Sequence, residues 1–178
     1  FQMFEKDLPG QNKSGLSFQE ASENVPVETC ETMNDSWGFN ITDRNYKSAK
    51  QLIQYIVGAA GRNANFLLNI GPMPNGLVQP EFVDTLKKVG EWMQQYGETI
   101  YGTRGMMIAP QEWGVATIKN KTLYLHILNT PRQDGYIFIP ELKDKVVKAT
   151  KFADRTQEIH IKVLHILIEL VEREFEES

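Results

Sequence analysis

The sequence predicts an α/β region followed by an all-β region, and two features carry this prediction. From residue 1 to residue 97, amphipathic helical patterns alternate with short apolar strands. That alternation is typical of the last part of a β/α barrel or of a doubly wound sheet. After Gly102, short strands are separated by turn residues, which indicates an antiparallel β unit. We therefore expect a domain boundary near residue 102.

The first elements are a loop, a short strand and a helix. Residues 1–24 predict a loop because they are polar and contain Pro9-Gly10 as a turn. Residues 25–30 have a strand-like pattern. Asp43 or Asn45 can cap the start of the helix, and Gly61 can end it. Apolar residues at helical spacing form one helix face, namely Ala49, Leu52, Ile53, Ile56 and Ala60.

A second strand and a second helix complete the α/β region. The apolar residues 66–70 form a short strand that stops at Gly71-Pro72. An apolar strand after an amphipathic helix suits a parallel sheet, whose strands are covered on both faces. A helix over about residues 81–96 is stopped by Gly97. Its apolar face comprises Phe82, Leu86, Val89, Trp92, Met93 and Tyr96.

The second half of the chain predicts strands and then a helical tail. Strands are expected at residues 115–118, 122–128 and 136–139, and Asn120-Lys121 separates the first two at hairpin spacing. Near the end, residues 158–163 alternate between polar and apolar, as a strand does, whereas residues 163–175 have helical spacing. We interpret this last segment as an acidic amphipathic helix.

Composition and charge exclude several classes of function. The net charge is −4 and no stripe of Lys and Arg occurs, so we expect no nucleic-acid partner. Cys30 is the only cysteine, which excludes an internal disulfide and a multi-cysteine metal site. The histidines form no HExxH pattern, and we predict no metal. The apolar run at residues 163–170 is too short for a membrane span, which takes about 20 residues.

Carboxylates and one tryptophan remain as candidates for chemistry. Glycoside hydrolysis uses two carboxyl groups, one as acid and one as nucleophile or base. Glu5, Glu20, Glu23, Glu28 and Glu31 lie in the first segment, and on composition alone each is expected to be a solvated surface acid. Glu28 stands out because it falls within an apolar strand-like stretch, where a carboxylate is costly unless paired or functional. Trp37, next to Gly38 in a loop, can stack on a sugar or anchor the loop.

Several short runs occur together in an order that resembles a known family. One is the octapeptide from Asn65 to Pro72, and others are Gly76-Leu77 and Gly90-Glu91-Trp92. The rest are Val27-Glu28-Thr29-Cys30, Ser36-Trp37-Gly38-Phe39 and Gly97-Glu98-Thr99-Ile100-Tyr101. From about residue 1 to about residue 150, these runs resemble the α-L-fucosidases of glycoside hydrolase family 29 in order and spacing.

The resemblance implies a catalytic β/α barrel followed by a β-sandwich, and retaining hydrolysis of terminal α-L-fucosides. It implies an Asp nucleophile that lies upstream, so no residue of this chain matches it and we expect the isolated chain to be inactive. For the acid/base carboxylate, the resemblance makes Glu5 the first choice. Glu28 is the alternative acid/base or a residue lining the pocket, although Val27 replaces the family's Trp there. Trp37 resembles the sugar-stacking Trp.

The family resemblance also sets the expected organisation and partners. Residues 1–102 would be the closing part of the barrel, residues 103–156 an incomplete antiparallel β-sandwich, and residues 157–178 an atypical tail. The substrate would be a fucosylated glycan or fucoside, with no cofactor, in a periplasmic, extracellular or lysosomal compartment. A sandwich without its closing strands would expose an edge, which favours self-association. A non-catalytic carbohydrate-binding module and a structural role for the tail are the alternatives.

Overall fold

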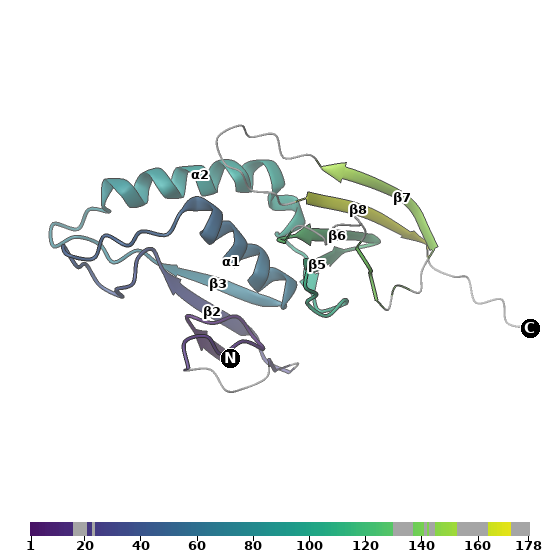
Figure 1. Cartoon of the computed structure of the whole chain (residues 1–178), viewed down its shortest axis with the longest axis horizontal. Helices are drawn as coiled ribbons and strands as arrows, with labels where there is room; N and C mark the ends of the chain where they lie inside the picture. Colours follow the sequence, from purple (N-terminus) through teal and green to yellow (C-terminus); the bar gives the residue numbers. More distant parts are fainter. Residues whose placement is uncertain are drawn as a thin grey trace, which may run out of the picture.

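Two sheets and two helices make up the described part of the protein. The computed structural model describes residues 1–15, 21–22, 24–129, 137–140, 142, 145–152 and 164–171. The first sheet has three strands and the second has five. Figure 1 shows the smaller sheet and both helices toward the amino end of the chain, with the larger sheet beside them.

The smaller sheet is parallel, with strand order β1-β2-β3. Its strands are β1 (Gln2–Glu5), β2 (Val27–Thr32) and β3 (Ala64–Asn69). The expected strands at residues 25–30 and 66–70 are thus confirmed with shifted ends. The expected loop over residues 1–24 is wrong at β1, because pairing with β2 makes these four residues a strand. Pairing between distant segments is invisible to a local turn pattern.

Both predicted helices are confirmed. Helix α1 (Ala49–Gly61) starts with a capping box, in which Ser48 and Gln51 bond each other's backbone N–H groups. Ser48 therefore caps this helix, in place of Asp43 or Asn45. Helix α2 (Pro80–Tyr96) begins with a proline, whose ring suits the first helical turn, and continues into the 3-10 turn η1 (Gly97–Thr99).

The two helices cover one face of the parallel sheet. Tyr55 of α1 stacks on Phe66 of β3 with ring centroids 5.7 Å apart, and Leu68 packs against the core between the helices. Figure 1 shows α1 and α2 on the same side of β2 and β3. No helix or strand of the described residues covers the opposite face. Met3 and Leu67 are each 48% exposed there, whereas Cys30, level with Leu67 on the same face, is buried. This uncovered face therefore combines apolar side chains with open access.

The larger sheet has strand order β4-β5-β6-β8-β7, and all its neighbouring strands are antiparallel. The β5–β6 hairpin turns at Asn120-Lys121 as expected, and Asn120 has a positive φ of 55°. The strand expected at residues 136–139 is wrong for residues 137–139, which are irregular; Tyr136 lies outside the described residues. The strands are β4 (Arg104–Gly105), β5 (Gly114–Lys119), β6 (Thr122–Ile127), β7 (Lys145–Phe152) and β8 (Leu164–Val171).

The helix expected over residues 163–175 is wrong where the structure describes it. Residues 164–171 form β8, which pairs with β6 on one side and β7 on the other. Residues 164–171 contain so many apolar residues that their pattern fits a helix and a central strand of a sheet equally well. The backbone hydrogen bonds offered by β6 and β7 decide in favour of the strand. The expected alternation at residues 158–163 lies outside the described residues.

Close contacts join the helices to the antiparallel sheet. The Met106 N–H donates to the Gly61 carbonyl at 3.0 Å, at the end of α1. The Thr117 hydroxyl of β5 donates to the Thr99 carbonyl of η1 at 2.7 Å and bonds His126 Nε2 at 2.8 Å. A side chain at Gly61 would overlap Val115 of β5. The end of α1 therefore sits directly against the antiparallel sheet. In the described part of the chain, every helix is too short or too polar to cross a lipid bilayer.

Candidate active site

The carboxyl ends of the parallel strands form one edge of the small sheet. Because β1, β2 and β3 run in the same direction, Glu5, Thr32 and Asn69 end their strands on the same side. In β/α barrels this is the edge that carries the reacting groups, on strand ends and the loops that follow. The candidate residues are therefore judged by their position relative to this edge.

Glu5 lies at this edge and on the uncovered face. It is the last residue of β1 and is exposed. Side chains alternate between faces along a strand, so Glu5 shares its face with the exposed Met3, while Phe4, 1% exposed, points toward the helices. The Glu5 carboxylate can therefore reach a ligand bound over the uncovered face.

Glu28 lies on the same face but further from the edge. It is level with Met3 and Asn65, whereas Glu5 is level with Cys30, two residues further along β2. Two residues of strand correspond to about 7 Å. Burial raises the pKa of the Cys30 thiol, and the negative charges of Glu5 and Glu28 raise it further. The structure thus brings both candidate carboxylates to one surface, with Glu28 deeper.

Trp37 lies in the loop after β2, and both neighbouring strand ends hold that loop. Trp37 is 41% exposed, and Nζ of Lys6, the residue after Glu5, lies 5.2 Å from the centroid of its ring. Lys6 Nζ also donates to the Asp35 carbonyl at 2.7 Å, and Asn69 Nδ2 donates to the Trp37 carbonyl. Trp37 can therefore serve both roles. Its backbone carbonyl anchors the loop, and its partly exposed side chain remains free to stack on a ligand.

Glu31 is a buried carboxylate that sequence reasoning treated as a surface acid. It is 5% exposed and pairs with Lys47 Nζ at 3.3 Å. It also accepts the Thr32 N–H at 2.8 Å. Burial, and then the Glu31 carboxylate, raise the pKa of the Tyr55 phenol. Alternation from Val27 and Thr29 could have placed Glu31 on the helix-covered face, where its partners satisfy it structurally.

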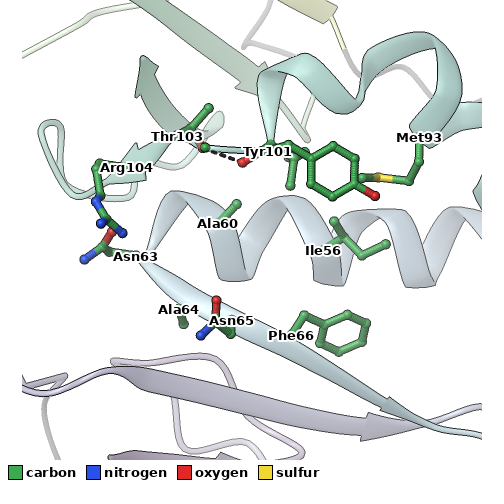
Figure 2. A pocket seen from close by; sticks show the side chains of 12 residues that line it. Ile56, Ala60, Asn63, Ala64, Asn65, Phe66, Met93, Tyr101, Thr103 and Arg104 are labelled. Carbon is green, nitrogen blue, oxygen red and sulfur yellow. Dashed lines mark hydrogen bonds between the residues drawn. The ribbon is translucent and has the colours of Figure 1, made fainter. Parts of the chain in front are cut away.

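A cavity of about 470 Å³ lies away from this edge. Figure 2 shows it beside the amino end of β3, between Phe66, Tyr101 and Met93, with Arg104 near Asn63 at its mouth. Ala64, the first residue of β3, lines it, whereas Glu5, Glu28 and Trp37 do not. It is therefore separate from the candidate site. Among the described residues, no cluster of three His, Cys, Asp or Glu side chains could hold a metal ion.

Comparison with solved structures identifies the fold. Alpha-L-fucosidase isoenzyme 1 from Paenibacillus thiaminolyticus superposes with a TM-score of 0.76 and 29% identity, over 96% of this chain and 45% of that one. The alpha-L-fucosidase from Vibrio sp. strain EJY3 superposes with a TM-score of 0.67 and 26% identity, over 84% of this chain and 28% of that one. The arrangement of the two sheets is thus shared with known alpha-L-fucosidases.

Sequence comparison agrees with the structural likeness. Tissue alpha-L-fucosidase from Mus musculus is 36% identical over 73% of this chain, and the alpha-L-fucosidase from Branchiostoma floridae is 33% identical over 58%. The chain spans only 28% and 24% of these two relatives. A family model described as alpha-L-fucosidase matches residues 1–98. With more than half of its residues matched by that model, this chain belongs to the alpha-L-fucosidases of glycoside hydrolase family 29.

Proposed function

We propose that this chain supplies the acid/base side of a retaining α-L-fucosidase whose nucleophile lies on polypeptide outside the chain. The observation that carries the proposal is Glu5, an exposed carboxylate that ends a parallel strand at the edge shared with Trp37. The mouse relative is called tissue alpha-L-fucosidase, and the chain spans 28% of it. A terminal α-L-fucoside of a glycan is the proposed substrate.

Glu5 would act twice in the reaction. In a retaining mechanism the acid first protonates the glycosidic oxygen as the nucleophile attacks the anomeric carbon, and the leaving alcohol departs. The same group, now a carboxylate, then removes a proton from water, which displaces the nucleophile and regains the original configuration. The two carboxyl groups of such enzymes lie about 5 Å apart. The missing nucleophile must therefore approach the uncovered face near Glu5.

Trp37 and Glu28 would shape the sugar pocket. Trp37 is partly exposed, so its ring can pack against the apolar face of fucose, and Lys6 Nζ lies 5.2 Å from the ring centroid. Glu28, about 7 Å deeper on the same face, would hydrogen-bond sugar hydroxyls. It remains the alternative acid/base residue, because it shares the surface with Glu5.

Residues 1–102 would form the closing part of a β/α barrel. Its outer face is the one that α1 and α2 cover, and its inner face is the one on which Met3 and Leu67 are exposed. Barrel interiors are filled by such side chains from alternate strands, so the rest of the barrel would bury them. Residues 103–156 would form part of the β-sandwich, and β8, which lies in the expected tail, pairs with β6 in the same sheet.

The isolated chain should not turn over an aryl α-L-fucoside, because it lacks the nucleophile. In the enzyme completed by upstream polypeptide, Glu5→Gln should lower kcat by about 10²- to 10⁴-fold, the usual contribution of a general acid/base. Azide should restore part of the activity on a substrate with an activated leaving group, because it needs no base to attack.

Glu28→Gln is the matched control for this assay. It should leave kcat within about tenfold and act mainly on KM, and azide should not rescue it. Azide rescue of Glu28→Gln and not of Glu5→Gln would exchange the two roles. Fucoside hydrolysis by the isolated chain that disappears in Glu5→Gln would refute the missing nucleophile.

A further inference from the structure

A second cavity, of about 450 Å³, lies on the helix-covered side of the protein, where the candidate active site does not reach. Its walls come from the loop after β1, from α1, and from the start of β5 with the segments that precede β5 and follow β6. Leu8, Gln54 and Val115 represent these three walls. Glu5, Glu28 and Trp37 do not line it. Any ligand bound here would be distinct from the fucoside.

The side chains lining this cavity carry an excess of positive charge. Lys13, Lys47 and Arg62 line it, together with a single carboxylate, Glu112. Lys47 is already neutralised by Glu31 at 3.3 Å, which leaves two cations of the lining, Lys13 and Arg62, against the one carboxylate of Glu112. The two residues belong to different walls, because Lys13 lies in the loop after β1 and Arg62 is the C-cap of α1. A ligand between them would contact two positive groups.

The Arg62 guanidinium uses few of its N–H donors within the described residues. Within the described residues its side chain donates only to the Gly58 carbonyl, through Nη1 at 3.1 Å. A guanidinium has five N–H donors in a planar fork, which matches the oxygens of a carboxylate, phosphate or sulfate. Burial lowers the pKa of this guanidinium, and no carboxylate offsets that effect. A half-buried arginine with mostly unused donors, facing a cavity, is typical of an oxyanion site.

We propose that this cavity binds a small ligand that carries an oxyanion, with Arg62 and Lys13 contacting the anionic group. The half-buried carboxamides of Gln11 and Gln54, which also line the cavity, would bond hydroxyls on the rest of the ligand. The recognised chemistry is a carboxylate, phosphate or sulfate on a hydroxylated molecule. The proposal is independent of the fucosidase reaction.

Isothermal titration of the whole chain with inorganic phosphate, inorganic sulfate, glucuronate and glucose tests the site. We expect saturable binding of the anions and none of glucose. Tighter binding of glucuronate than of the inorganic ions would identify a sugar acid as the ligand type, and the reverse order a phosphate or sulfate. No saturable binding of any of the three anions would overturn the proposal.

Two variants locate the binding. Arg62→Gln should weaken anion binding at least about tenfold, the usual effect of losing a charge-assisted hydrogen bond. Lys13→Gln, in an exposed loop, should weaken it without affecting folding. Lys50→Gln removes the same charge from an exposed position of α1 that does not line the cavity, and it should bind like the original chain. Equal affinity in all three variants would refute the site.

Discussion

Side chains alternate between faces along β2, so its two carboxylates, three positions apart, lie on opposite faces of the sheet. Glu28 lies on the uncovered face together with Glu5, whereas Glu31, three positions later, lies beneath α1 and pairs with Lys47. Glu28 therefore faces the proposed ligand, whereas Glu31 is buried between the sheet and α1. A buried carboxylate must keep its counterion, because its desolvation is otherwise uncompensated.

Lys47→Met should therefore destabilise the chain by about 3 kcal/mol, because Glu31 would remain buried without its ion-pair partner. Urea unfolding followed by circular dichroism measures this loss. Lys50→Met, at an exposed position of the adjacent helix, should change stability by less than about 0.5 kcal/mol.

The double variant Lys47→Met with Glu31→Gln isolates the interaction. Removing both charges should cost less than the sum of the two single changes, by at least about 1 kcal/mol. Strict additivity of the three unfolding free energies would mean that the pair contributes nothing.

At the scale of elements, the start of α1 depends on its cap more than on its charges. The Ser48 hydroxyl accepts the Gln51 backbone N–H, and the Gln51 side-chain oxygen accepts the Ser48 backbone N–H. The first turn contains no acidic residue. Helix α2 uses a different device, a proline in its first turn, and its N-cap side chain makes no capping bond. The two helices should therefore respond differently to changes at their N-caps.

Ser48→Ala should cost about 1 kcal/mol, since the Gln51 backbone N–H loses the Ser48 hydroxyl as its acceptor. Chemical unfolding gives the magnitude, and Lys50→Ala provides a control in the same turn without a cap role. A loss for Ser48→Ala no larger than that for Lys50→Ala would show that the capping box is not stabilising.

At the scale of the whole molecule, the two sheets are joined at the end of α1. Gly61 lies against Val115, and its carbonyl accepts the Met106 N–H. Interiors are packed too densely to absorb an extra methyl group at such a contact without displacement. The relative position of the parallel and antiparallel units thus depends on the absence of a side chain at residue 61.

Gly61→Ala should destabilise the chain by about 2 to 3 kcal/mol through overpacking against β5. Gly90→Ala is the matched control, because Gly90 is also helical but faces open space. Alanine has the better helix propensity, so this control should stabilise by about 0.5 to 1 kcal/mol. Thermal unfolding distinguishes the two, and a gain for Gly61→Ala would contradict the close contact.

Sequence reasoning succeeded for elements whose signal is local. The helix that includes Leu52 and Ile53 and the hairpin turn at Asn120 were found because periodicity and turn chemistry act within a few residues. It failed for β1, whose partner β2 lies 25 residues further along the chain, and for β8, whose partner β6 lies at least 37 residues away. Short or uniformly apolar segments carry no local mark of such pairing.

By itself, the sequence determined the alternation of helix and strand, the antiparallel hairpin and the family, because apolar spacing and short motifs are properties of contiguous residues. Only the tertiary structure decided which carboxylates share a surface. Strand register aligns Glu5 with Cys30 and places Glu28 two residues further from the carboxyl edge of the sheet. The helices bury Glu31 on the other face. Register and helix packing arise from contacts between distant segments, so no single stretch of the chain encodes them.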